Sequence, residues 1–257
     1  MQSIYRSLGG IGAWPGLAHG VVGMRFTGAF QDCSADLVEQ WRSQVAEGVS
    51  DRDAFFAAVR GRLRANMIMA VTDTSADDPL EFQVSFVHRF SLPSGIIRGV
   101  DPQEDQRFSQ FGDQDYLRTC VIPAYLSVIE MRRPVIDQVK GKLFGFRILY
   151  DRIILPEPGS RGRVGWCLSL TETRFALPIP DCDPCLDYED IKVLQLLREG
   201  ESAKEIGERC GFSKRTIEGR IERLRRRFGA RNVAHLIALS LSHACESRQA
   251  SDGSATV

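Results

Sequence analysis

The residues best suited to chemistry are basic ones gathered near the end of the chain. Residues 214–231 hold two acids and eight basic residues, namely Lys214, Arg215, Arg220, Arg223, Arg225, Arg226, Arg227 and Arg231. Over its 257 residues the chain balances 33 Lys and Arg against 33 Asp and Glu, so this charge is a local concentration. Guanidinium and ammonium groups on one element neutralise phosphates, which points to a nucleic acid as partner.

The apolar residues of the same segment predict a helix. Ile217, Ile221, Leu224 and Phe228 are spaced four, three and four residues apart, as on the core face of an amphipathic helix. The opposite face carries Arg215, Gly219, Glu222, Arg223 and Arg226. Such a face can enter a major groove. Gly219 lowers helix propensity by roughly 1 kcal/mol relative to alanine, so we infer that its backbone lies close to DNA.

Three more helices are predicted around it, completing an all-α unit over residues 186–245. The first spans residues 187–198, with Ile191, Leu194 and Leu197 on one face, and ends at Gly200. Ser202 and Glu205 form a capping box for the second, which contains Ile206 and ends near Cys210–Gly211. Ser213 caps the basic helix. Asn232 caps the fourth, which offers four residues for burial: Ala234, Leu236, Ile237 and Leu239.

These motifs resemble the LuxR/NarL-type helix-turn-helix over about 55 residues, from LDYEDIKVLQLL to RFGARNVAHLIAL. The matching positions are Gly200, Lys204-Glu205-Ile206, Ser213, Thr216-Ile217 and Gly229. The resemblance implies a transcriptional regulator that binds double-stranded DNA as a homodimer at a palindromic site. It also implies that helix four often lies at the dimer contact.

The chain departs from the family pattern at three places. Glu189-Asp190 stands where the family usually has Arg-Glu, Arg220 replaces a common His, and Glu218 and Glu222 replace basic residues. Because a carboxylate can accept a hydrogen bond from the amino group of cytosine, we expect an unusual operator and weaker binding to random DNA. The alternative is that both glutamates pair with Arg215, Arg225 or Arg226 along the helix.

The expected DNA contacts fall into two groups. Those expected at base edges are Arg215, Glu218, Glu222, Arg223 and Arg226. Those expected at phosphates are Lys204, Ser213, Lys214, Thr216, Arg220 and Arg227.

The preceding residues, 1–175, predict an α+β domain. Helices are expected from Ser34 through Val45, from Ser50 through Leu63 and over residues 116–131, where Pro123 marks a kink or a first turn. Strands are expected at residues 81–90, 134–139, 143–155 and 163–171. Short turns between them imply an antiparallel sheet with the helices on one face. Residues 176–185, with three prolines, are predicted to be a linker, and residues 246–257 a disordered tail.

Residues 116–175 resemble the PAS-like sensor domains of proteobacterial regulators, with a helix, Pro134, a strand ending in YDRIILP, a turn and a last strand. This resemblance implies a small cavity that holds a small-molecule ligand of unknown identity or nothing. A rival is the autoinducer-binding domain of acyl-homoserine-lactone receptors. Their Trp-x-x-x-Tyr motif is broken here, because Val45 follows Trp41 and no such partner precedes Asp101-Pro102.

The remaining features bound the function. The longest apolar runs, such as residues 67–71, are too short to cross a bilayer, and no secretory signal begins the chain, so we expect a cytoplasmic protein. Cys182 and Cys185 have the spacing of a metal or redox site but lack a second ligand pair, so we expect no metal. No cofactor signature or nucleophile–base pair supports an enzyme. A partner protein that dimerises with another regulator without binding DNA is the second hypothesis.

Overall fold

The computed structural model describes residues 28–88, 106–179 and 185–252, with side chains to residue 242. Its N-terminal part combines helices with one six-stranded sheet in which every strand pair is antiparallel, in the order β3-β2-β1-β6-β5-β4. The strands are β1 (Met67–Asp73), β2 (Gln83–His88), β3 (Gln106–Arg107), β4 (Val135–Leu143), β5 (Phe146–Pro156) and β6 (Trp166–Pro178). Together with the helical C-terminal part, this confirms the predicted α+β class.

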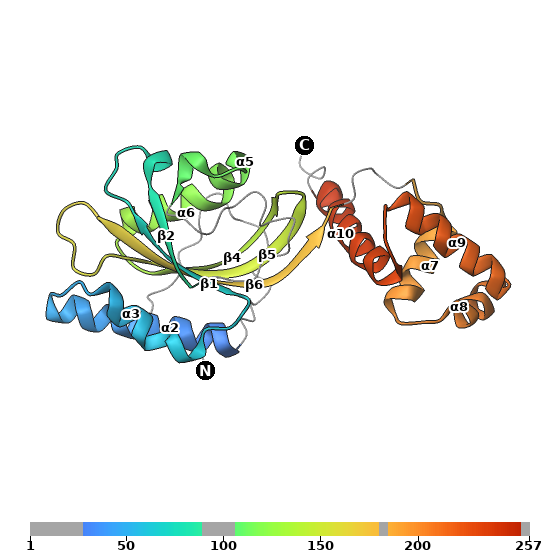
Figure 1. Cartoon of the computed structure of the whole chain (residues 1–257), viewed down its shortest axis with the longest axis horizontal. Coiled ribbons are helices and arrows are strands. Elements are labelled where there is room, and N and C mark those ends of the chain that lie inside the picture. Colours follow the sequence, from blue (N-terminus) through green and yellow to red (C-terminus); the bar gives the residue numbers. More distant parts are fainter. Residues whose placement is uncertain (1–27, 89–105, 180–184, 253–257) are drawn as a thin grey trace.

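Helices cover both faces of the sheet, which corrects the prediction of one covered face (Figure 1). On one face α2 (Gly28–Glu47) and α3 (Arg52–Val59) pack through Phe30, Leu37 and Phe55 on apolar residues of β1, β5 and β6. On the other face, α6 (Ile122–Met131) covers a second cluster, which includes Tyr125 and Val128, and α5 (Gln114–Tyr116) contributes Tyr116 to a third. Strand side chains alternate between two faces, so one sheet supplies both cores.

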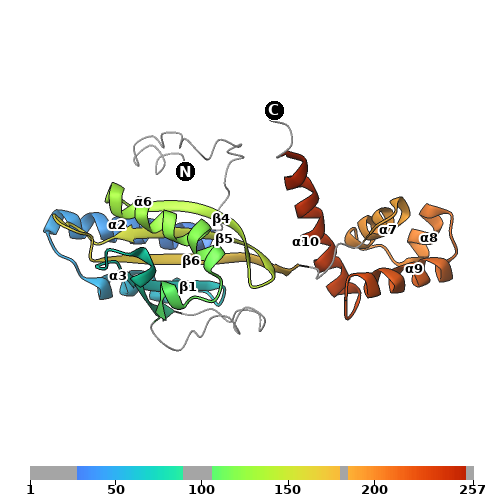
Figure 2. The same cartoon turned by 90° about the horizontal axis from the view of Figure 1, so that it is seen from above.

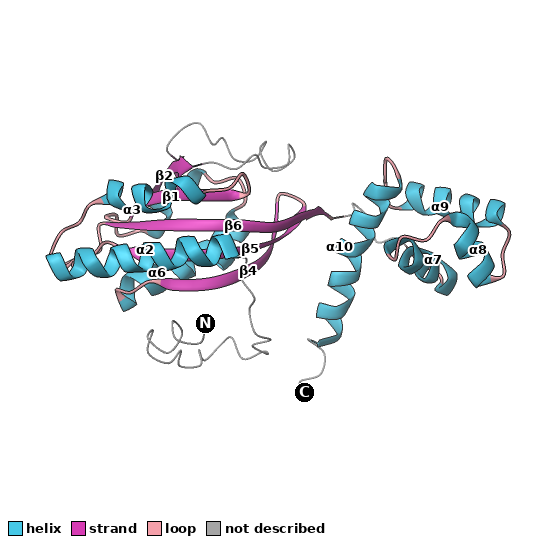
Figure 3. Cartoon of the chain, turned by 90° about the horizontal axis from the view of Figure 1, so that it is seen from below, coloured by secondary structure: helices cyan, strands magenta, loops and turns pink. Residues whose placement is uncertain are grey.

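Strand β1 is a central element that the sequence pattern did not predict. It lies between β2, the next strand along the chain, and β6, the last strand of this part. Met67 and Met69 join the core under α2 and α3, whereas Thr72 meets Tyr125 on the other side. A central strand buried on both faces lacks the alternation that marks a half-buried strand. Figure 3 shows β1 within the sheet.

The predicted helices of this part are present with different details. The first begins at Gly28 instead of Ser34. The second begins at Arg52 instead of Ser50 and is capped by Asp51, whose carboxylate accepts from the amides of Asp53 and Ala54. The helix predicted over residues 116–131 is interrupted by a π-helical turn over Leu117–Val121, and Pro123 lies in the first turn of α6, as predicted.

The C-terminal part is a four-helix unit built from α7 (Tyr188–Arg198), α8 (Ala203–Cys210), α9 (Lys214–Arg227) and α10 (Val233–Asp252). The predicted caps are confirmed: the Ser202 and Glu205 capping box, Ser213 at α9, and Asn232, whose side chain accepts from the His235 amide at 2.8 Å. The predicted apolar seam of α9 is buried around Leu194, Ile206 and Leu236. In Figure 2, this unit lies beyond the end of β6, with α10 next to that strand.

Several boundaries and burial assignments differ from the prediction. Ile191 is 54% exposed, because the core face of α7 runs through Asp190, Val193 and Leu194, and Ala234 is also exposed. Strand β6 continues to Pro178, three residues into the predicted linker, because residues up to Pro178 still pair with β5. Helix α10 continues to Asp252, into the predicted disordered tail. Linker residues 180–184 and tail residues 253–257 lie outside the described part.

Candidate nucleic-acid interface

The turn between α8 and α9 is built on two glycines. Gly211 ends α8 in the left-handed region, with φ of 73°, where a side chain is strained. Gly207 is buried inside α8, and a Cβ atom there would lie 2.7 Å from the carbonyl oxygen of Phe212. The Phe212 amide also donates to the Gly207 carbonyl at 2.9 Å. These contacts fix how closely α9 follows α8, and the sequence pattern did not single out Gly207.

Helix α9 presents the predicted face outward. Ile217, Ile221 and Leu224 are buried, and Ser213 caps the helix by accepting from the Thr216 amide at 3.1 Å. All five side chains expected at base edges are exposed: Arg215, Glu218, Glu222, Arg223 and Arg226. So are five of the six expected at phosphates: Lys204, Ser213, Lys214, Thr216 and Arg227. At Gly219 a Cβ atom would meet nothing within 4 Å, so no contact within the protein requires glycine there.

The two glutamates of this face form short-range ion pairs. Glu218 pairs with Lys214 at 3.4 Å, and Glu222 pairs with Arg225 at 2.7 Å. The predicted pairing along the helix is therefore found for Glu222, whose partner is Arg225. Glu218 also pairs along the helix, but with Lys214, which was not among the predicted partners. Exposed pairs of this kind contribute about 0–1 kcal/mol, so DNA can displace them. Both carboxylates remain exposed.

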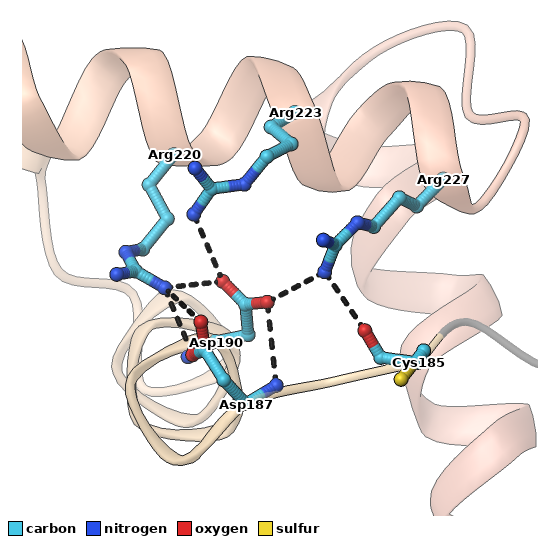
Figure 4. Close-up of polar contacts among 6 residues, drawn as sticks. All are labelled: Cys185, Asp187, Asp190, Arg220, Arg223 and Arg227. Atoms are coloured by element: carbon cyan, nitrogen blue, oxygen red, sulfur yellow. Dashed lines mark hydrogen bonds and ion pairs between the residues drawn. The ribbon is translucent and has the colours of Figure 1, made fainter.

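A buried carboxylate on α7 gathers arginines of α9 (Figure 4). Asp190 is fully buried, and its Oδ1 accepts from Arg220 at 2.6 Å and from Arg223 at 3.5 Å. Its Oδ2 accepts from Arg227 at 2.9 Å. Arg220 also contacts both carboxylate oxygens of Asp187, at 2.9 and 3.0 Å. We call these five residues the Asp190 cluster.

The cluster changes the expectation for Arg220. The sequence predicts it at a phosphate, whereas the structure holds its guanidinium against α7 with only 17% of the side chain exposed. Burial alone lowers the pKa of Arg220, but the hydrogen bonds to Asp190 and Asp187 raise it overall. The Asp187 carboxyl has a lowered pKa, because it accepts from the Asp190 amide and from Arg220. Arg220 therefore stays charged in the interface between the two helices.

Arg227 and Arg223 take part in the cluster but remain partly accessible. Arg227 also donates to the Cys185 carbonyl at 2.8 Å, which ties the start of the helical unit to α9. Both arginine side chains are about 40% exposed or more. One feature of the sequence could have indicated this arrangement: Asp190 is an acidic residue on the face of α7 that also carries the buried apolar residues Val193 and Leu194.

Buried hydroxyls lie between the sheet and α6 in the N-terminal part. Thr72 donates to the Tyr125 hydroxyl at 2.9 Å, and Tyr125 donates to Ser169 at 3.2 Å. The hydroxyls of Tyr116 and Tyr150 are 2.5 Å apart, and burial raises the pKa of Tyr150 to about 12. These phenols are therefore neutral hydrogen-bonding groups in the interior.

Arg152 joins the strands of this region to the π-helical turn. It donates to both Asp137 oxygens, at 2.9 and 2.6 Å, and to the Cys120 carbonyl at 2.9 Å. The indole N–H of Trp41, the residue that begins the broken lactone motif, donates to the Pro156 carbonyl at 2.8 Å, and Val45 is exposed. Asp101-Pro102 lies outside the described residues.

The described residues carry neither a metal-ligand group nor a membrane-spanning helix. Among them, no group of three or more His, Cys, Asp or Glu residues is placed to hold a metal ion. Cys185 is exposed with a free thiol, and Cys182 lies outside the described part. No described helix is long and apolar enough to cross a membrane.

The geometry of α8, its tight turn and α9 defines the C-terminal part as a helix-turn-helix domain. Residues 189–240 match the family model described as "Bacterial regulatory proteins, luxR family". This stretch is therefore a LuxR-family helix-turn-helix domain, as the sequence motifs predict. The family is one of regulatory proteins, not of enzymes. No curated protein sequence matches the chain.

Solved structures of LuxR-type regulators are among the structural neighbours. A phage VqmA–DPO complex is 19% identical and covers 74% of this chain and 89% of its own, with a TM-score of 0.30. Vibrio cholerae VqmA is 18% identical, with coverages of 69% and 82% and a TM-score of 0.25. Escherichia coli SdiA is 10% identical, with coverages of 86% and 92% and a TM-score of 0.25. At these TM-scores the whole-chain likeness carries no argument, so the assignment depends on residues 189–240.

Proposed function

We propose that this protein is a cytoplasmic transcriptional regulator that binds double-stranded DNA as a homodimer, with α9 in the major groove. The observation that carries the proposal is the exposed outer face of α9, with Arg215, Arg223 and Arg226, within a LuxR-family domain. Arginine can donate two hydrogen bonds to guanine in the major groove. The chain regulates and does not catalyse in this proposal.

The base contacts that we propose are Arg215, Glu218, Glu222, Arg223 and Arg226. The proposed phosphate contacts are Lys204, Ser213, Lys214, Thr216 and Arg227, of which Arg227 is shared with the Asp190 cluster. Arg220 is omitted because it is bound to two carboxylates. Gly219 supports a close approach of the α9 backbone to DNA, since its Cβ position is open on the protein side.

The N-terminal part is proposed as a PAS-like sensor and dimerisation domain, which ends with β6. A small-molecule ligand or a partner bound there would change the relative placement of two α9 helices across the half-sites. The resemblance of residues 116–175 to PAS-like sensor domains supports a ligand of this kind. For this chain the proposal extends to a small molecule as the class of signal and names no particular compound.

A second candidate is an interaction protein that dimerises with another regulator without binding DNA itself. The observation in its favour is the pair of exposed acids, Glu218 and Glu222, on the outer face of α9. These carboxylates repel the phosphates of DNA, and only a hydrogen bond from a base, such as one from the amino group of cytosine, would offset that repulsion.

Selection of duplexes from a random pool by the purified full-length chain, followed by a mobility-shift assay, separates the two candidates. The regulator proposal expects one enriched palindromic sequence and a shifted complex. The absence of any enriched duplex, with and without cell extract as a ligand source, would favour the interaction protein. Native mass spectrometry of the same sample reports the oligomer and any retained small molecule.

A further inference from the structure

The Asp190 cluster, which lies between α7 and α9 and is partly buried, contains more positive than negative charge. Two carboxylates, Asp187 and Asp190, face three arginines of α9. Because Asp190 is fully buried, its carboxylate is stable only with these cations around it. The cluster therefore does two things together: it joins α7 to α9, and it restrains three of the arginines that the sequence predicts at DNA.

The three arginines are restrained to different degrees. Arg220 makes the shortest contact with Asp190, at 2.6 Å, and is the least exposed. Arg227 is 2.9 Å from the carboxylate and is anchored by the Cys185 carbonyl as well. Arg223 is the most loosely bound, at 3.5 Å, and 44% of its side chain is exposed. Because Arg223 is the farthest of the three from Asp190, it is the arginine of the cluster whose side chain can move to DNA with the smallest loss of interaction energy.

We propose that Asp190 is a positioning residue for DNA readout, which holds Arg220 and Arg227 against α7 and directs Arg223 along the groove-facing side of α9. This inference rests on the proposed function. Without the Asp190 charge, the arginines become freer to reach phosphates, which are sequence-independent partners. Asp190 thus limits binding to random DNA and favours selected sites.

The test substitutes Asp190→Asn, which preserves size and removes the charge. The slope of log affinity against log salt steepens by about 0.9 for each additional phosphate that the protein neutralises. We expect the slope of Asp190→Asn to steepen by about 0.9 to 1.8, and its preference for the selected duplex over random DNA to fall by roughly tenfold or more. A slope and a preference equal to those of the wild type would overturn the proposal.

Asp187→Asn is the matched control. Asparagine caps a helix as well as aspartate does, and Asp187 is exposed and pairs with only one arginine of the cluster, Arg220. With Asp190 still in place, we expect the salt slope to stay within experimental error of the wild type. A steepening as large as that of Asp190→Asn would contradict a specific role for Asp190, because general loss of acidic charge would then explain both.

Arg220→Gln keeps the proposal testable if Asp190→Asn does not fold. Glutamine retains a hydrogen-bond donor, and Asp190 keeps Arg223 and Arg227 as partners. We expect an unchanged salt slope, because Arg220 contacts protein and not phosphate. A slope flatter by about 0.9 would show that Arg220 binds a phosphate and would overturn the assignment. The wild-type chain is tested beside the variants in the same assay. If it captures no duplex, the proposed function itself is contradicted, which is a different outcome from a variant that behaves like the wild type.

Discussion

The Cβ position of Gly207 lies 2.7 Å from the carbonyl oxygen of Phe212, so the turn between α8 and α9 has no room for a side chain at residue 207. Real Cβ atoms do not approach backbone oxygens this closely, and both groups are held by the hydrogen bond from the Phe212 amide to the Gly207 carbonyl. A single glycine thus sets the approach of α9 to the helix before it.

Gly207→Ala is therefore expected to destabilise the C-terminal domain by about 1–3 kcal/mol, as overpacking does in well-packed sites. The chain's three tryptophans, Trp14, Trp41 and Trp166, all precede this domain. Loss of helical circular dichroism at lower urea, with an unchanged tryptophan fluorescence transition, would locate the effect. If both transitions stayed at their wild-type midpoints, the close approach would be wrong.

Gly219→Ala tests the other interpretation of a glycine in the same unit. A Cβ atom at residue 219 meets nothing within 4 Å, so alanine should raise the stability of the domain by up to about 1 kcal/mol. If the α9 backbone lies close to DNA, the same variant should bind the selected duplex more weakly, by roughly tenfold. A more stable variant with undiminished affinity would remove the inferred reason for Gly219.

Arg223→Ala combined with Arg226→Ala tests the outer face of α9. Each arginine that contacts a base should contribute about 1–3 kcal/mol, and the loss of two charges should flatten the salt dependence. A control with Arg42→Ala and Arg118→Ala removes two exposed arginines from the N-terminal part. Equal losses of affinity in the two double variants would indicate a general charge effect and would contradict the assigned face.

Tyr125→Phe tests the buried hydroxyls between the sheet and α6. It removes the acceptor of the Thr72 hydroxyl and the donor to Ser169, and all three residues are buried. We expect a loss of about 1–3 kcal/mol in the tryptophan fluorescence transition. Tyr188→Phe, at a residue of the C-terminal part that is 75% exposed, should change the stability measured by helical circular dichroism by less than about 0.5 kcal/mol. Similar effects at both positions would show that the buried hydroxyls add nothing.

Ser202→Ala tests the capping box of α8 and its dependence on pH. Loss of the cap should cost about 1 kcal/mol at pH 7. Hydrogen bonds from the Ser202 amide and hydroxyl lower the pKa of Glu205 below its usual 4.5. A lowered carboxyl pKa stabilises the fold above about pH 4.5 and ceases to do so as the pH falls through the folded pKa. The difference in the free energy of unfolding between wild type and variant should therefore shrink below about pH 4.5. A difference that stays constant with pH would contradict the hydrogen bonds between Ser202 and Glu205.

Short-range signals predicted the C-terminal domain well. The caps at Ser202, Ser213 and Asn232 and the seam of α9 depend on residues within one or two turns, so sequence spacing suffices for them. The Asp190 cluster could not be predicted in the same way, because it joins residues 30 to 37 positions apart. The same limit applies to β1, whose pairing with β6 bridges about a hundred residues.

The burial of Asp190 also explains why the sequence pattern misplaced Ile191 on α7. Ile191 is apolar and spaced three residues from Leu194, so the pattern puts it in the core. Three arginines make a buried carboxylate at residue 190 stable, and the core face of α7 turns toward them. Ile191 is consequently exposed. A charged group in the core can be recognised only when its partners in space are known.

The proposed function depends on α9 lying in the major groove of duplex DNA. The N7 atoms of purines lie in that groove, so replacing single purines of the selected duplex by 7-deazapurines reports directly on contacts there. We predict that substitutions in two half-sites, centred about one helical turn or a multiple of it apart, weaken binding. Binding that tolerates 7-deazapurines at every position of the selected duplex would contradict the placement of α9 and with it the proposed function.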